Sequence, residues 1–267
     1  MHLSKHHGLG NDFLVALESL NGPLSGDPAV ARALCDRHTG LGADGLIWGA
    51  ASDEADVVFR LHNADGTDAE ISGNGLRCLV QAHLRSVGRS EGTVSVATPG
   101  GVRRAVATAT SDPTTLSVSA EMGEVKQGPE LPAVVGELGF DQAATGSVGN
   151  PHVVLLGPGS LAPDLASIDL TKVGRRIEDA VPGGANVHII ELDGPDTLVM
   201  RPWERGVGIT EACGSGATVA AWVARDWGLV GDSVTVRMPG GATVVELNGA
   251  GASLAGPASY VADVETP

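Results

Sequence analysis

The chain has 267 residues, of which 42% are hydrophobic and 18% are charged, so it can bury two cores of ordinary domain size. A formal net charge of −15 argues against nucleic acid or an anionic membrane as the main partner. No apolar run approaches the ~18 residues of a transmembrane helix, the N-terminus lacks the apolar core of a signal peptide, and the 3 cysteines are too widely spaced to predict a disulfide framework. We therefore expect a cytoplasmic protein.

The first part of the chain predicts strands, turns and one short helix. Residues 2–17 read as a strand, a GLGND turn and a second strand. Asn11 in that turn either caps the backbone, as Asn most often does there, or presents its amide to a polar ligand. Residues 28–38 predict an amphipathic helix that buries Cys35. The GLGADG segment at 40–45 fits a dinucleotide fingerprint in letters only, because a strand rather than a helix follows it.

A longer helix follows a predicted strand at 57–62 and an NADGT turn. Residues 71–88, ISGNGLRCLVQAHLRSVG, have apolar side chains at helical spacing after a Gly-x-Gly turn. Gly88 is placed where a helix C-terminus needs a positive φ. Ser72 lies directly before the Gly-x-Gly turn, at the start of the helix.

The same pattern returns in the second half of the chain, where residues 212–228 read ACGSGATVAAWVARDWG with Cys213 in the place of Ser72. Three further pairs of segments match in the same order: GLGNDFLVAL (8–17) with SVGNPHVVLL (147–156), GADGLI (42–47) with GANVHII (184–190), and VSVATPGGVRRAVA (94–107) with VTVRMPGGATVVEL (234–247). Two copies of this length predict two similar lobes rather than a solenoid.

The least informative segment, 111–147, is interpreted as the connection between the lobes. We predict an N-terminal lobe at 1–117, completed by a C-terminal strand at about 255–267, and a C-terminal lobe at 118–254.

The two helix starts carry the predicted chemistry. A helix N-terminus after a Gly-x-Gly turn offers free backbone N–H groups and a positive dipole end to an anion, so two of them could hold one carboxylate. A thiol at such a position has a lowered pKa, which makes Cys213 a candidate base, whereas most free cysteines are simply small buried residues. Ser72 and Cys213 on opposite faces of one Cα–H would be the arrangement for inverting a stereocentre.

Several motifs together resemble the diaminopimelate epimerase family. They are HGLGNDF (7–13), CDRHTGLGADGL (35–46), NADGTDAE followed by SGNGLRC (63–78), VGNPH (148–152), GANV (184–187) and ERGVGITEACGSG (204–216), and the TPGG and MPGG strands continue the match. The resemblance implies an α/β fold of the α+β type, with two pseudo-symmetric lobes. Each lobe would be a curled, mostly antiparallel sheet or barrel around a central helix, with the active site in the cleft between lobes.

The resemblance also implies an activity. This is the cofactor-independent epimerisation of LL-diaminopimelate to meso-diaminopimelate, a step in lysine and peptidoglycan precursor biosynthesis, by two-base proton transfer. It implies a small-molecule substrate, no metal, no nucleic acid or membrane partner, and a homodimer.

By the same resemblance, Cys213 is one acid/base. The α-carboxylate would be held by backbone N–H groups of Gly73, Asn74, Gly214 and Ser215. The distal end and the α-amino group would be bound by Asn11, Asn63, Asn150, Asn186, Glu204 and Arg205. His152 and Glu204 would help to deprotonate the sulfur groups, although a lone His152 would more often be structural.

One position departs from the family pattern, because Ser72 stands where the family has its other catalytic cysteine. An alcohol is a far weaker acid than a thiol, so Ser72 is a poor base, while it can still donate a proton or a hydrogen bond. Three explanations compete: an introduced replacement of a native cysteine, a natural paralogue with one-base chemistry, or a slow but genuine epimerase. We predict a weak or nearly inactive epimerase.

Two rival classes remain open: a one-base racemase, dehydratase or isomerase of the same fold, and a non-catalytic amino-acid-binding paralogue. A pyridoxal phosphate enzyme is disfavoured because Lys5, Lys126 and Lys172 lie outside every motif. A zinc site is disfavoured because Cys35 and His38 have no partner pair at ligand spacing.

Overall fold

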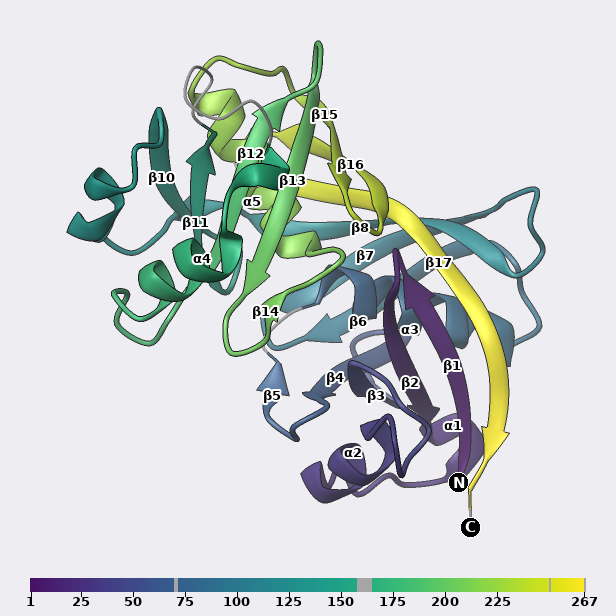
Figure 1. Ribbon diagram of the computed structural model, residues 1–267. Helices are drawn as coiled ribbons and strands as arrows, with labels where there is room; N and C mark the ends of the chain where they lie inside the picture. Colours follow the sequence, from purple (N-terminus) through teal and green to yellow (C-terminus); the bar gives the residue numbers. More distant parts are fainter. Residues whose placement is uncertain (70–71, 158–164, 250, 267) are drawn as a thin grey trace. The chain divides into compact units, whose positions relative to one another are not determined.

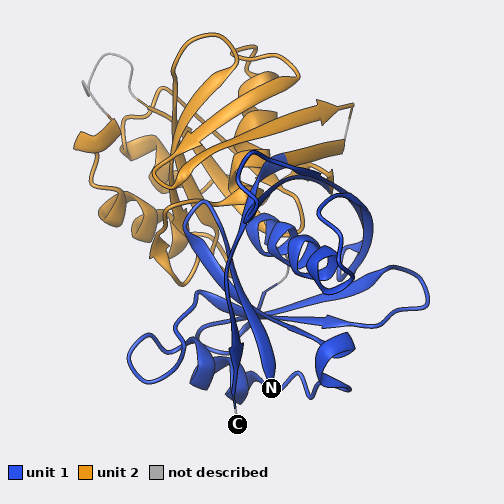
Figure 2. Cartoon of the chain, turned by 90° about the vertical axis from the view of Figure 1, so that its right-hand side faces the viewer, with its two compact units in different colours: residues 1–121, 255–267 blue, residues 122–254 orange. Residues whose placement is uncertain are grey.

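The structure is a computed structural model that describes residues 1–69, 72–157, 165–249 and 251–266 (Figure 1). The chain forms two compact units, each described here by itself (Figure 2). Unit 1 comprises Met1–Glu121 and Ala255–Pro267, and unit 2 comprises Met122–Leu254. The division predicted from the sequence lies at 117/118 and 254/255, and residue 267 of its last strand lies outside the described residues.

Unit 1 contains a long helix and a sheet whose last strand pairs with its first. Its strands are β1 (His2–Gly8), β2 (Asn11–Leu17), β3 (Gly45–Ala50), β4 (Val57–Asn63), β5 (Asp68–Ala69), β6 (Gly92–Thr98), β7 (Gly101–Ala109), β8 (Thr115–Glu124) and the later part of β17 (Gly251–Glu265). Its helices are α1 (Glu18–Asn21), α2 (Pro28–Cys35) and α3 (Gly73–Ser86). The predicted strands and helices of the N-terminal half are thus present.

The strands of unit 1 form a closed barrel. Pairing runs from β1 through β2, β3, β4, β6, β7 and β8 to β17, and β17 pairs back with β1. The β2–β3 and β4–β6 pairs are parallel, while β1–β2, β3–β4, β6–β7, β7–β8 and β1–β17 are antiparallel. This is the mostly antiparallel, curled sheet that the resemblance implied.

The helix α3 is the core of that barrel. It packs against β1, β2, β3, β4, β6 and β7, and its Leu76, Leu79 and Val80 are at most 1% exposed. Arg77 and Gln81 on the same helix are buried as well. A helix that is buried on every side is expected at the centre of a fold rather than on its surface.

Unit 2 contains a second set of strands around a central helix. Its elements include β9 (Lys126–Gln127), η1 (Ala133–Glu137), β10 (Gln142–Ser147), β11 (Pro151–Leu156), η2 (Leu165–Ser167), α4 (Leu170–Glu178), β12 (Asn186–Leu192), β13 (Thr197–Glu204), β14 (Gly208–Ile209), α5 (Gly214–Asp226), β15 (Ser233–Met238) and β16 (Gly241–Asn248).

The pairing in unit 2 repeats that of unit 1. The β11–β12 and β13–β15 pairs are parallel, as β2–β3 and β4–β6 are in unit 1. The pairs β10–β11, β12–β13 and β15–β16 are antiparallel, and α5 packs against β10, β11, β12, β13, β15 and β16. The predicted fold of two similar lobes, each built around a central helix, is confirmed.

Both central helices end as the sequence predicts. Gly88 has φ +70° after α3, and Gly228 has φ +72° after α5. The amide of Gly88 donates to the carbonyl of Arg85, and that of Gly228 donates to Arg225. A residue with a side chain would be strained at this φ, so glycine is required to turn the chain out of each helix.

The described residues also bear on two of the compositional expectations. Cys35, Cys78 and Cys213 are free and buried. Within the described ranges, none of the helices has the length and apolarity needed to cross a membrane.

Candidate functional site

The starts of α3 and α5 share one backbone geometry. Ser72 precedes α3 with φ −139° and ψ 114°, and Cys213 precedes α5 with φ −131° and ψ 108°. Both are therefore extended N-cap residues, and the next two residues of each helix are buried. The first-turn amides of an α-helix have no partner within the helix, so each start is suited to an anion.

Ser72 caps its own helix. Its Oγ accepts the backbone N–H of Gly75 at 3.0 Å, which is the standard arrangement for a serine at an N-cap. A Cβ added to Gly75 would lie 3.2 Å from both Cβ and Oγ of Ser72. The Ser72 hydroxyl is thus held by a hydrogen bond that it accepts, and it can still donate its own proton.

The Asn74 amide in the first turn of α3 and the Asn11 amide that it contacts are fixed in orientation. Asn74 accepts a hydrogen bond from Arg77 at its Oδ1, 2.5 Å away, and donates from its Nδ2 to Asn11 Oδ1 at 3.1 Å. Asn11 in turn donates from its Nδ2 to Asp44 at 2.7 Å. Burial lowers the pKa of Arg77 to about 10, which still leaves the guanidinium charged at neutral pH. This cation decides which end of the Asn74 amide points toward Asn11.

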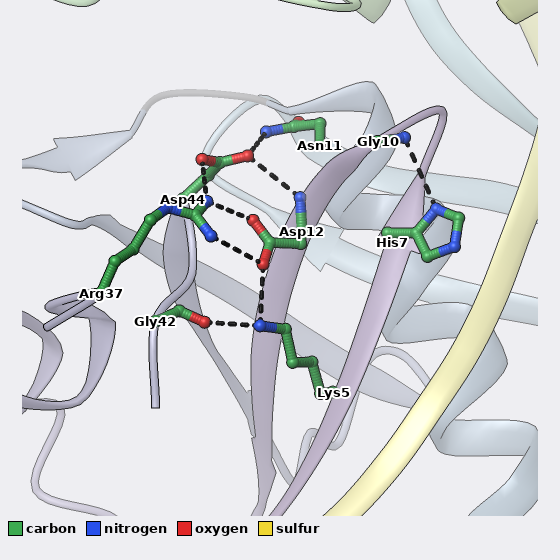
Figure 3. A network of polar contacts seen from close by, with 8 residues as sticks. All are labelled: Lys5, His7, Gly10, Asn11, Asp12, Arg37, Gly42 and Asp44. Atoms are coloured by element: carbon green, nitrogen blue, oxygen red, sulfur yellow. Dashed lines mark hydrogen bonds and ion pairs between the residues drawn. The ribbon is translucent and has the colours of Figure 1, made fainter. Parts of the chain in front are cut away.

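A network of charged side chains supports Asn11 from the other side (Figure 3). Arg37 lies between two carboxylates, 2.6 Å from Asp12 and 2.7 Å from Asp44, and Lys5 is 2.9 Å from Asp12. Burial acts to raise the pKa of Asp12, but the hydrogen bonds from Arg37 and Lys5 outweigh it and hold that pKa below its ordinary value. This network was not predicted from the sequence, although Asp12 and Asp44 lie in the GLGND and GLGADG turns and Lys5 and Arg37 lie three residues before them.

Asn63 lies at the same end of the sheet as Asn11. Gly45 pairs with Asn63 in β4 and with Phe13 in β2, so the start of β2 and the end of β4 are separated by one strand. The Asn63 amide donates to Thr67 Oγ1 at 3.0 Å. Its described hydrogen bond therefore holds the turn that follows β4.

In unit 2, Cys213 lies in a buried polar environment. Its side chain is only 3% exposed, its Sγ is 3.7 Å from Ser215 Oγ, and its amide donates to Met238 Sδ at 3.4 Å. Burial raises the pKa of the Cys213 thiol well above its ordinary value, and the Glu204 carboxylate acts in the same direction. The N–H of Gly216 and the hydroxyl of Ser215 oppose this shift but do not reverse it. The expectation of a lowered Cys213 pKa is wrong for this structure, because burial and a nearby carboxylate outweigh the helix end.

Glu204 lies beside Cys213, and the next residue, Arg205, is hydrogen-bonded through its backbone to Asn186. Glu204 ends β13, accepts a hydrogen bond from Thr210 Oγ1 at 2.7 Å, and interacts with the Cys213 thiol. The amide of Arg205 donates to Asn186 Oδ1 at 3.0 Å, and Asn186 Nδ2 donates to the carbonyl of Pro151 at 3.0 Å. Asn186 thus ties the start of β12 to β11 and to the turn after β13, while the Arg205 side chain is exposed.

A chain of polar side chains leads from Cys213 into the core of unit 2. Asn150 Nδ2 donates to Ser215 Oγ at 3.4 Å, and Asn150 Oδ1 is 2.8 Å from His152 Nε2. His152 Nδ1 is 2.9 Å from Nε2 of His188. Burial lowers the pKa of His152 well below its ordinary value and that of His188 to about 3, so both rings are neutral at neutral pH. His188 was not among the residues predicted from the sequence, where its only signal is a histidine inside the apolar GANVHII strand.

The GSG turn of α5 leaves no room for a side chain at its second glycine. A Cβ added to Gly216 would overlap Cε1 and Nε2 of the His188 ring and lie 3.1 Å from Cys213 Sγ. We expect Gly216→Ala to lower the free energy of unfolding by about 1–3 kcal/mol, because the ring must move inside a packed core. Urea unfolding measures this. The control is Gly136→Ala, where the added Cβ would meet no described atom within 4 Å apart from the adjoining chain and the change should stay within about 0.5 kcal/mol. Equal midpoints for the two variants would contradict the packing argument.

The described residues contain no group of three or more His, Cys, Asp or Glu side chains that could hold a metal ion.

Comparison of the sequence with known proteins points consistently to one family. A family model described as "Diaminopimelate epimerase" matches residues 3–127 and 145–261. Proteins named diaminopimelate epimerase from Sphingopyxis alaskensis and Desulfitobacterium hafniense are each 36% identical to this chain, over 98% of the chain and 96% of the relative.

Solved structures with the same fold are more distant. A PhzF-family phenazine biosynthesis protein from Bacillus anthracis matches with a TM-score of 0.74 at 15% identity, covering 100% of this chain and 99% of its own. A hydroxyproline epimerase from Agrobacterium vitis matches with a TM-score of 0.71 at 17% identity, covering 100% and 90%. At these identities the likeness shows the fold alone.

Proposed function

Because the chain belongs to the diaminopimelate epimerase family, we propose that it inverts one α-carbon of 2,6-diaminopimelate and converts the LL form to the meso form. The family resemblance predicted from the motifs is confirmed by these matches, and with it the class of enzyme, an isomerase. The observation that carries the proposal is the pair of extended N-cap residues, Ser72 and Cys213, each before a helix start suited to an anion.

The α-carboxylate of the substrate would be bound by backbone N–H groups of Gly73, Asn74, Gly214 and Ser215. This binding matters most when the α-carbon loses its proton. The electron pair left behind spreads into the carboxylate, so the charge on its oxygens grows. Fixed N–H donors that point at this charge stabilise the transition state more than the ground state.

The acid and base roles fall to Cys213 and Ser72. In the proposed reaction one of them removes the α-hydrogen as a proton, and the other supplies a proton to the opposite face of the same carbon. The raised pKa of Cys213 is compatible with a base role in the complex, because the α-ammonium group of the substrate brings a cation beside the thiol and favours the thiolate. Glu204, which interacts with Cys213, is suited to accept the thiol proton.

The distal end of the substrate carries a second carboxylate and a second ammonium group. We assign Asn11, Asn63, Asn150, Asn186, Glu204 and Arg205 to the distal end and the α-amino group. The exposed Arg205 guanidinium can form a two-point contact with a carboxylate, and amide oxygens together with Glu204 can accept from ammonium groups. His152 stays a proposed supporting acid/base, and its described contacts lead to Cys213 through Asn150 and Ser215.

The proposed reaction needs no cofactor, since both proton transfers use side chains of the chain. We also propose a cytoplasmic homodimer without a nucleic-acid or membrane partner. The net charge of −15 supports the last point, and the dimer follows from the family resemblance.

Ser72 favours a second candidate, one-base chemistry on another amino acid by the same fold. It also keeps open a non-catalytic amino-acid-binding role. Both alternatives predict that the distal ammonium group of diaminopimelate contributes little to binding.

Calorimetric titration separates these candidates, because binding does not depend on a fast base. We expect LL-diaminopimelate to bind at least about tenfold more tightly than 2-aminopimelate, which lacks only the distal ammonium group, since a charged hydrogen bond contributes about 1.5–3 kcal/mol. Arg205→Gln should weaken binding of both ligands. Arg225→Gln, which alters an arginine paired with Asp232 at the other end of α5, should leave both unchanged. Equal affinity for the two ligands would overturn the substrate assignment.

A further inference from the structure

We propose that His188 is a positioning residue for this reaction: it holds His152 in a single tautomer and thereby fixes the direction of the Asn150 amide. The contacts that carry this lie within unit 2 and do not depend on the substrate. Only the consequence for substrate binding rests on the proposed function.

The two histidines are held by neighbouring parallel strands. His152 in β11 is paired with Asn186, two residues before His188 in β12. Both rings are fully buried, their planes are tilted by 31°, and Nδ1 of His152 is 2.9 Å from Nε2 of His188. Because burial keeps both rings neutral, each carries one proton, and one ring must donate to the other.

The direction of this hydrogen bond follows from the surroundings of Nδ1, the other ring nitrogen of His188. His188 Nδ1 is buried and has no hydrogen-bond partner among the described residues. If His188 donates from Nε2, its Nδ1 is an unpaired acceptor. If it accepts at Nε2, its Nδ1 carries a buried proton with no acceptor. Orphaned buried N–H groups are the rarer and less favourable case, so His188 donates to His152 Nδ1.

The directions of the remaining hydrogen bonds then follow. His152 keeps its proton on Nε2, which donates to Asn150 Oδ1 at 2.8 Å. Asn150 must therefore direct its NH₂ group away from His152, and that group donates to Ser215 Oγ. The tautomers of the two buried histidines thus place the NH₂ donor of Asn150 at the start of α5, next to Cys213.

The backbone of α5 is held against the same ring. A Cβ at Gly216 would overlap His188, so the ring lies directly on the first turn of the helix. The orientation of the ring and the position of the GSG turn are therefore coupled by packing as well as by hydrogen bonds.

Two variants of the full chain test the inference. His188→Gln keeps an N–H donor within reach of His152, whereas His188→Leu removes it and keeps the site apolar. Long-range ¹⁵N–¹H NMR on protein with ¹⁵N-labelled histidine reports which ring nitrogen carries each proton. We expect a single His152 tautomer with the proton on Nε2 in the unchanged chain and in His188→Gln, and a mixture in His188→Leu.

Calorimetry with LL-diaminopimelate supplies the functional readout. We expect about tenfold weaker binding for His188→Leu and close to full recovery for His188→Gln, as for loss and rescue of one hydrogen bond at the site. A His152 proton on Nδ1 in the unchanged chain would overturn the inference, whatever the binding. So would equal binding by both variants while the tautomers differ. If the tautomers are as stated and no form of the chain binds diaminopimelate, the substrate assignment fails while the tautomer order stands.

Discussion

Ser72→Cys is expected to raise the rate of epimerisation of LL-diaminopimelate by about 10²–10⁴-fold, the range that a positioned acid or base contributes. The physical reason is the acidity of the group. A thiol is far more acidic than an alcohol and can become a thiolate beside the ammonium group of the substrate, whereas a serine hydroxyl cannot without a dedicated base. The described hydrogen-bond partner of the Ser72 hydroxyl is the Gly75 amide, which donates to it and so cannot take its proton.

The unchanged chain should show a distinctive partial activity. With Cys213 as its one thiol at a helix start, it should exchange the α-hydrogen of one configuration in D₂O and return deuterium to the same face. Inversion should be slow. Proton NMR of the α-position measures exchange, and separation of the LL and meso isomers measures inversion.

Ser72→Ala is the matched control for this substitution. It removes the hydroxyl and the cap, so it should cost about 1 kcal/mol of stability without accelerating inversion. If Ser72→Cys leaves inversion at the rate of the unchanged chain, Ser72 is not in the place of a base. That result would favour one-base chemistry on another amino acid or a non-catalytic binding role.

Cys213→Ala is expected to abolish both exchange and inversion in the unchanged chain, and to abolish inversion in the Ser72→Cys background, where the introduced thiol can still exchange the α-hydrogen on its own face. The loss should be at least about 10²–10⁴-fold, because no other thiol of the unchanged chain lies at a helix start. The structure adds an expectation about stability. The raised pKa keeps Cys213 a neutral thiol at neutral pH, hydrogen-bonded to Glu204, so its removal should lower the free energy of unfolding by about 1–3 kcal/mol. Exchange in D₂O and urea unfolding on the same samples separate the two effects.

Cys35→Ala serves as the control for the loss of a buried thiol. Cys35 is 1% exposed and belongs to a hydrophobic cluster with Leu14, Leu46 and Trp48. Its substitution should lower stability modestly and leave exchange intact. Exchange that persists in Cys213→Ala at the rate of the unchanged chain would remove Cys213 from the proposed mechanism.

The internal repeat of the sequence determined the architecture of the two units. Four matched segments in one order predicted two copies of one topology, and the parallel pairs β2–β3 and β11–β12 lie at matching places in the two copies. Local chemistry also determined both ends of the central helices. Ser72 and Cys213 are extended residues before small, flexible ones, and Gly88 and Gly228 adopt the positive φ that other residues avoid. These features depend on residues that are neighbours in the chain, so they can be predicted from the sequence.

The tertiary structure alone decided the electrostatics around those helix starts. The sequence favoured a lowered pKa for Cys213 from its helix position, but burial by other strands and Glu204, nine residues earlier in the chain, raise it. The ion pairs of Asp12 with Lys5 and Arg37, and the His152–His188 contact, likewise join segments that are separated in the chain. Desolvation and Coulomb interactions depend on distance in space. The residue pattern can therefore indicate where the chemistry lies, while folding sets the proton affinity of each group that performs it.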